Sequence, residues 1–147
     1  MSPPRVAGRK GKFDMAPLGG AKTTHYDPNR GLDAAAWLEL DEAERISLVM
    51  DYHRRARIKL PNAKLHAATH TIVENQAALG GAYVVAGTLE RLMHEGLDRH
   101  EAVHAVGSVL MGQVLAVQQG RLKGDLNEAY TQKLAELSAR KWRSGEW

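Results

Sequence analysis

Histidines at helical spacing are the residues of this chain whose type and position could do chemistry. His66 and His70 lie four residues apart, and so do His100 and His104. Residues four apart share one face of an α-helix, with side chains that start about 6 Å from each other. Each pair can therefore present two imidazoles to one metal ion, and two neighbouring helices would bring four together. The pattern predicts one site for a divalent ion, zinc or iron, because both accept imidazole ligands.

A carboxylate accompanies each pair. Glu74 continues the stripe of His66 and His70 one turn further on. There it could add an oxygen ligand or accept the second ring N–H of a ligand histidine. Because two pairs with carboxylates in register are harder to obtain by chance than one, we favour metal ligation over structural histidines. His25 and His53 have no partner at ligand spacing, so we expect them to take no part.

The second pair also reads H-E-x-x-H, from His100 through Glu101 to His104. In metallopeptidases with this pattern the two histidines bind zinc and the glutamate is the general base that activates bound water. Glu101 is therefore the candidate catalytic residue of a hydrolase or peptidase. Against this interpretation, an acidic residue in a first helical turn is also explained by the helix dipole, and the pattern leaves the first histidine pair unused.

Parts of the pattern resemble two enzyme families. Asn127-Glu128, downstream of the second pair, looks like the helix that supplies the third zinc ligand in the thermolysin-like gluzincins. That fold places a β-sheet beside its motif helix, and no period-2 strand pattern is visible here. Glu101-x-x-His104 also has the spacing used in ferritin-like di-iron bundles, which need a second such motif and two more carboxylates. Glu74 is a candidate for one of these.

A closer resemblance covers residues 60–120. The segment is similar to an uncharacterised bacterial family of small helical proteins, in which N-x-x-L-H-x-x-x-H is followed some thirty residues later by H-x-A-x-H. The matching residues here are Asn62, Leu65, His66 and His70, then His100, Ala102 and His104, and the Gln118-Gln119-Gly120 turn. The resemblance implies that the four histidines belong together. It brings no established activity and implies that the glutamate of H-E-x-x-H is incidental.

The composition and the lack of long apolar runs limit the kinds of site and the cellular location that we expect. The 147 residues include no cysteine, which excludes a disulfide framework, a thiolate metal site and a cysteine nucleophile. No apolar run approaches the roughly 20 residues that cross a bilayer, and Met1–Gly20 lacks the apolar stretch of a secretory signal. We expect no membrane partner and a cytoplasmic location.

Positive charge is concentrated at the start of the chain. Residues 1–31 hold six Lys and Arg against two Asp, whereas the whole chain has a net charge of only +3. This segment is also rich in Pro and Gly, which predicts a disordered basic tail. Such a tail would touch nucleic acid only weakly, through phosphates.

The remaining residues, 32–147, are predicted to form one helical domain. Helix-capping residues precede a series of apolar, helix-periodic segments: Asp33, Asp41, Asn62, Asp98 and Asp125. We expect helices over about 34–40, 42–60, 63–79, 82–95, 99–120 and 126–142, arranged as an all-α bundle of four to five helices. Gly107, Ser108 and Gly112 predict a close helix–helix contact, within the subunit or in a homodimer.

If four histidines close the metal's shell, a helical interaction module with a structural metal is the alternative to an enzyme.

Overall fold

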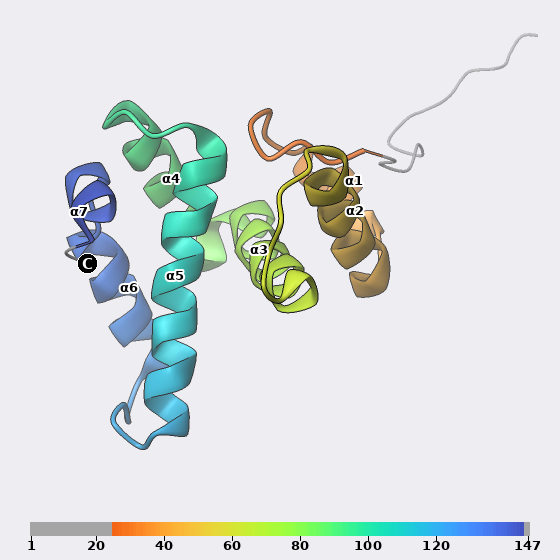
Figure 1. Cartoon of the computed structure of the whole chain (residues 1–147). Coiled ribbons are helices and arrows are strands. Elements are labelled where there is room, and N and C mark those ends of the chain that lie inside the picture. The colour runs from red at the N-terminus through yellow and green to blue at the C-terminus, as the bar shows by residue number, and fades with distance from the viewer. Residues whose placement is uncertain (1–24, 146–147) are drawn as a thin grey trace, which may run out of the picture.

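The structure, a computed structural model, describes residues 25–145, and its regular elements are all helical (Figure 1). No strand occurs among these residues, so the predicted all-α fold is confirmed. No helix in this range is both long and apolar enough to cross a membrane. The elements are α1 (Ala34–Glu39), α2 (Glu42–Arg55), α3 (Ala63–Ala78), a 3-10 turn η2 (Gly80–Ala82), α4 (Val85–His94), α5 (Arg99–Gln118), α6 (Leu126–Glu136) and α7 (Ala139–Ser144).

Side-chain caps fix where these helices begin. Each of the five predicted capping residues accepts a hydrogen bond from a backbone N–H in the first turn of its helix. Such a cap satisfies an N–H that has no partner inside the helix and contributes about 1 kcal/mol. At Asp41 and Asp98 the backbone N–H of the capping residue also donates to the carboxylate of the third helical residue, Glu44 or Glu101. This second hydrogen bond completes a capping box. The caps therefore fix the first residue of each helix that carries a clustered histidine.

Two predicted helix ends are wrong. α2 ends at Arg55 rather than near Leu60-Pro61, because Arg57 has a φ of 60°, a left-handed conformation that an α-helix cannot contain. The last predicted helix is divided into α6 and α7 at Leu137, whose backbone is extended and whose side chain is buried in the core. Ser138 then caps α7, so the new helix start has a partner for its N–H groups.

Two apolar cores lie on either side of α3, which stands between α2 and α5 (Figure 1). The C-terminal core is formed chiefly by α4, α5 and α6, with Leu92 and Leu134 fully buried. The N-terminal core contains five buried residues: Tyr26, Trp37, Leu40, Val49 and Ala67. α3 contributes to both cores, so it carries its histidines along the seam between them.

A glycine lets α3 and α5 approach closely. A Cβ atom added at Gly107 would lie 3.2 Å from the Cγ2 atom of Thr69 on α3, tighter than ordinary van der Waals contact. The small residue predicted to mark a helix–helix contact therefore marks one within the subunit. This approach brings the histidines of α3 and α5 within reach of one another.

The folded part of the chain begins earlier than the predicted boundary at residue 32. Tyr26 is only 1% exposed and packs in the N-terminal core, and Pro28 is buried as well. The predicted disordered tail is therefore wrong for residues 26–31, because an aromatic ring at Tyr26 anchors them. The rest of that prediction, residues 1–24, lies outside the described residues.

Candidate metal centre

Four histidines from three helices converge on one point at the seam between the cores. His53 comes from α2, His66 and His70 from α3, and His104 from α5. One ring nitrogen of each lies within 4.8 Å of the corresponding nitrogen of the other three. Three of the four residues are ones that helical spacing singled out. The cluster could hold a metal ion because its donors are all imidazole nitrogens.

The ring nitrogens in the middle of the cluster are at the separation that a shared metal ion imposes. The Nε2 atom of His66 lies 3.2 Å from Nε2 of His53 and 3.1 Å from Nε2 of His104. Two nitrogens bound tetrahedrally to zinc at 2.0–2.1 Å are about 3.3 Å apart. The agreement concerns donor atoms on three different helices, so it does not follow from the spacing of any one helix.

A buried tyrosine sets the tautomer of His70. The Tyr26 hydroxyl donates to Oε2 of Glu74 at 2.5 Å, and its oxygen lies 3.0 Å from Nδ1 of His70. Burial, reinforced by the Glu74 charge, raises the pKa of Tyr26 well above its usual value, so the hydroxyl keeps its single proton. Because that proton goes to Glu74, His70 must donate from Nδ1, which leaves the lone pair on Nε2.

Glu74 is held by an arginine rather than aimed at the cluster. Arg99 donates to both of its oxygens at 2.8 Å, and the Glu74 side chain is fully buried. Such a two-pronged pair uses the lone pairs that a metal would need. Spacing offered Glu74 two roles, direct ligation and acceptance of a histidine N–H. In the structure its oxygens accept from Tyr26 and Arg99, and it reaches His70 only through the Tyr26 hydroxyl.

A backbone carbonyl sets the tautomer of His53. Its Nδ1 lies 2.9 Å from the carbonyl oxygen of Val49, which can only accept, so the neutral ring donates from Nδ1 and keeps the lone pair on Nε2. His66 Nε2 therefore faces the lone pair of His53 on one side and His104 Nε2 on the other. If His66 lacks a proton there, two lone pairs face each other at 3.2 Å.

A proton on His66 Nε2 would remove the repulsion between the facing lone pairs of His66 and His53, but it would leave another buried nitrogen without a partner. Nε2 of His70 is buried and has no hydrogen-bond partner among the described residues. A buried polar atom without a partner costs about 1–3 kcal/mol. A cation at the centre would accept the lone pairs of His53, His66, His70 and His104 together, which no single proton can do.

Burial keeps these rings neutral. Desolvation, followed by the neighbouring histidines, lowers the pKa of His104 to about 3 and that of His70 well below the usual value. Burial and then His53 lower the pKa of His66. A histidine binds a metal only when it has lost its proton. His66, His70 and His104 therefore present neutral donors at pH 7.

His100, a predicted ligand, lies beside this group but is not a member of it. Its ring centroid is 4.2 Å from that of His104 and 5.1 Å from that of His70. Its Nε2 atom is buried and, within residues 25–145, has no hydrogen-bond partner. Desolvation, followed by the His53 charge, lowers its pKa to about 4. His100 is thus a neutral base next to the cluster.

Glu101, the candidate general base, is directed elsewhere. Its backbone N–H donates to the Asp98 carboxylate, and its own carboxylate accepts from the Asp98 backbone N–H, in the capping box at the start of α5. Adjacent residues lie about 100° apart around a helix, so Glu101 cannot share the face of His100 and His104. The carboxylate serves the helix end, where its charge is also favourable.

The interpretation of His53 as a bystander is wrong. It is only 4% exposed and belongs to the cluster. A sequence signal for it exists: Ile46, Val49, Met50 and His53 follow the i, i+3, i+4, i+7 pattern of one buried helix face. The position of His53 on an apolar helix face indicates that it is buried. This signal is stronger than the absence of a second histidine four residues away. His25, the other expected bystander, is exposed and outside the cluster.

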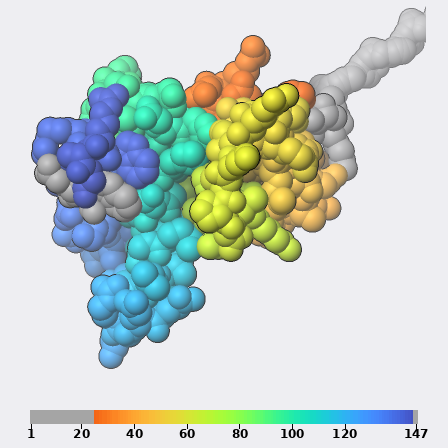
Figure 2. Space-filling view, in the orientation of Figure 1, coloured from red at the N-terminus to blue at the C-terminus, as the bar shows by residue number. Residues whose placement is uncertain are grey.

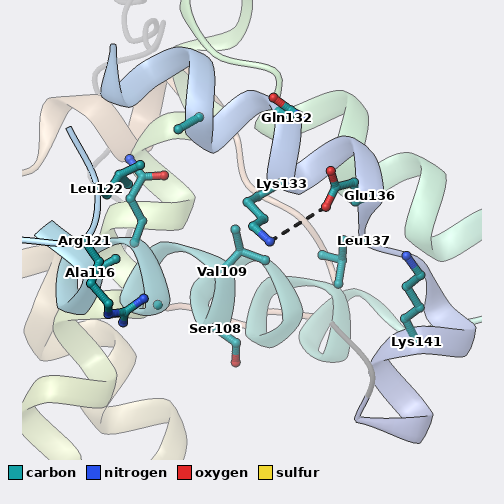
Figure 3. Close-up of a pocket in the computed structure, with 13 residues that line it drawn as sticks. Ser108, Val109, Ala116, Arg121, Leu122, Gln132, Lys133, Glu136, Leu137 and Lys141 are labelled. Carbon is teal, nitrogen blue, oxygen red and sulfur yellow. Dashed lines mark ion pairs between the residues drawn. The ribbon is translucent and has the colours of Figure 1, made fainter. Parts of the chain in front are cut away.

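Two grooves flank α5. The histidine groove, of about 480 Å³, has His66, His70 and His104 in its lining together with Leu65, Met111 and Trp142. The α5–α6 groove, of about 610 Å³, contains no histidine among its lining residues. Figure 3 shows the latter, with Lys133 and Glu136 of α6 forming an ion pair at 3.8 Å. Only the histidine groove leads to the cluster.

Comparisons with known proteins add no further information. No family model, curated protein or solved structure matches this chain. The interpretation of the cluster therefore rests on its own geometry.

Proposed function

We propose that this protein binds one divalent transition-metal ion, zinc or iron(II), through Nε2 of His53, His66, His70 and His104. The observation that carries the proposal is the approach of three ring nitrogens to 3.1 and 3.2 Å, with two tautomers fixed so that lone pairs face inward. His100, predicted as a ligand, would stand beside the ion, and Glu74 would support His70 through Tyr26.

The chemistry of the donors narrows the choice of metal. Four neutral nitrogen donors suit zinc, iron, copper and nickel, whereas magnesium and calcium prefer oxygen. The chain has no cysteine and therefore no thiolate to select copper(I). Zinc and iron(II) are the ions to test first.

The ion would join three helices that also pack against one another through the two apolar cores. His53, His66 and His104 come from α2, α3 and α5, so a shared metal would crosslink the N-terminal core to α5. Binding to the folded chain alone stabilises it, by about 2.7 kcal/mol when the free ion is at one hundred times its Kd. This arrangement supports a structural role for the metal.

A hydrolase is the second candidate, and one observation supports it: the buried, unpartnered Nε2 of His100 next to the cluster. Beside four histidine ligands a water would take a fifth position on the metal, and a neighbouring neutral histidine can take its proton. His100→Gln should then retain the metal and lose hydrolysis of activated esters, whereas Glu101→Gln should retain both. Equal esterase rates in His100→Gln and the unmodified protein would exclude this candidate.

X-ray absorption at the metal edge tests the proposed ligation. The protein is freed of metal with a chelator, loaded with zinc or iron(II), and measured beside His66→Gln. We expect nitrogen scattering at about 2.0–2.1 Å, with the outer-shell pattern of imidazole, and loss of that signal in the variant. Oxygen-only scattering, or an unchanged spectrum in His66→Gln, would contradict the proposal.

A further inference from the structure

The histidine groove is lined by apolar residues and histidines, and also by Asn62, Thr69 and Ser108. Leu65 comes from α3, Met111 from α5 and Trp142 from α7, and Leu65 is 49% exposed to solvent. A volume of about 480 Å³ lies within the range of roughly 300–1,000 Å³ that is usual for small-molecule sites. The groove is therefore large enough for a small molecule with an apolar body.

The same groove offers nothing to balance the charge of a metal ion. Among its described lining residues histidine is the only ionisable type, and none is acidic. The four proposed ligands are neutral, and the buried carboxylate nearby, Glu74, is already paired with Arg99. A divalent ion here would be the dominant local charge. An anion that enters the groove would meet an uncompensated positive centre at its floor.

We propose that the histidine groove binds a small monocarboxylate with an aliphatic body, its carboxylate as a fifth ligand of the metal and its chain against Leu65, Met111 and Trp142. The inference rests on the proposed function, because the metal supplies the charge that the carboxylate recognises. Charge complementarity favours an anion over a neutral molecule. The apolar walls favour a carboxylate with a hydrocarbon chain over a phosphate, which would need several hydrogen-bond donors along the groove.

Cobalt(II) in place of the native ion gives a direct readout, because its visible spectrum changes when a ligand joins the metal. The full chain is loaded with cobalt, its metal content is measured, and it is titrated with acetate, octanoate or 1-octanol. Each methylene that leaves water contributes about fourfold in affinity. We expect both acids to change the spectrum, octanoate to bind at least about thirtyfold more tightly than acetate, and 1-octanol to leave the spectrum unchanged.

Two leucines of equal exposure provide matched variants. Leu65 lies in the groove, whereas Leu79, 50% exposed, ends α3 outside it. Leu65→Ser should weaken octanoate about tenfold and leave acetate unaffected, and Leu79→Ser should change neither. Equal losses in both variants, or octanoate no tighter than acetate, would overturn the inference.

Metal content separates the two proposals. If the protein takes up no cobalt, the proposed function fails, and the inference fails with it. If cobalt is bound and octanoate leaves its spectrum unchanged, only the inference fails. Octanoate that binds equally well to metal-free protein would show an apolar groove without metal recognition, which also overturns the inference.

Discussion

The two sides of α5 are held to the rest of the molecule by different chemistry. Towards α4 and α6, α5 packs against an apolar core that includes Leu92 and Leu134, both fully buried. Towards α3 and α2, it meets a cluster of histidines and the Glu74–Arg99 ion pair. Apolar burial is stabilising without any ligand, whereas buried polar groups are stabilising only when each has a partner. The apolar side therefore needs no ligand, whereas the histidine side has buried nitrogens that find no partner in the described part of the chain and that an ion could satisfy.

The two ends of α5 also differ in how far they are covered by the rest of the molecule. The far end of α5 and its connection to α6 project from the body in Figure 2, and several apolar residues are exposed there: Val114, Leu115, Val117 and Leu126. His100 and His104 lie in the first turns of α5, away from this projection. The contrast can be tested by perturbing each side separately.

The largest effect is expected at the buried ion pair. Glu74→Gln would leave Arg99, whose side chain is only 12% exposed, without a counter-charge. Removing one partner of a buried pair costs about 3–5 kcal/mol, which urea unfolding would measure. Asp51→Asn, which breaks the exposed pair with Arg54, should cost less than about 1 kcal/mol. Similar losses in the two variants would mean that the Glu74–Arg99 pair is not specially buried.

On the apolar side, Leu134→Ala should cost about 2–5 kcal/mol, because it leaves a cavity in the C-terminal core. The account predicts the same loss with and without metal, and an unchanged metal affinity measured by competition with a chelator. A large fall in metal affinity would show that the two sides are not independent.

Acid should weaken the histidine side first. Burial lowers the pKa of His104 to about 3 in the folded protein, against 6.5 for an ordinary histidine. The unfolded chain therefore takes up a proton below pH 6.5 that the folded chain refuses, so stability is fully present above pH 6.5 and is lost as the pH falls towards 3.

For metal-free protein, we expect His104 alone to lower the free energy of unfolding by about 2 kcal/mol between pH 7.5 and pH 5. His104→Gln should reduce this pH dependence, and Leu134→Ala should retain it. A pH dependence that is the same in His104→Gln as in the unmodified protein would contradict a buried neutral His104.

The smallest effect is expected at the tyrosine that supports His70. Tyr26→Phe removes one hydroxyl, which bonds to Glu74 and His70. Loss of such a supporting bond typically lowers metal affinity about 10–100-fold, and stability should fall by about 1 kcal/mol. Tyr83→Phe, at an exposed tyrosine, should change neither quantity. Unaltered metal affinity in Tyr26→Phe would show that the tautomer of His70 is set in another way.

Local patterns predicted most of the helices, because caps and helix periodicity are local properties. Asp33, Asp41 and Asp98 begin helices where predicted. The break at Leu137 was missed, since it depends on how that side chain fits a core built from distant residues. Arg57 was missed because nothing in its neighbours demands a positive φ.

The residues of the candidate site were likewise predicted where a local pattern reveals them and missed where none does. His66, His70 and His104 belong to pairs on one helix face, which a repeat of four residues reveals. His53 stands alone on its helix, and only its place on an apolar stripe indicates burial. Tyr26 lies 44 residues from His70, a contact that no local pattern encodes. His100 and His104 share a face, yet of the two His104 alone belongs to the cluster, and no pattern within α5 distinguishes them.

The most direct test measures the metal content of the untagged protein by elemental mass spectrometry, with His53→Gln and His25→Gln prepared in parallel. His53 lies in the cluster, whereas His25 is exposed and outside it. The account predicts close to one zinc or iron per chain in the unmodified protein and in His25→Gln, and a large loss in His53→Gln. Equal metal content in all three proteins, or no metal in any of them after loading with zinc and iron(II), would contradict the central claim.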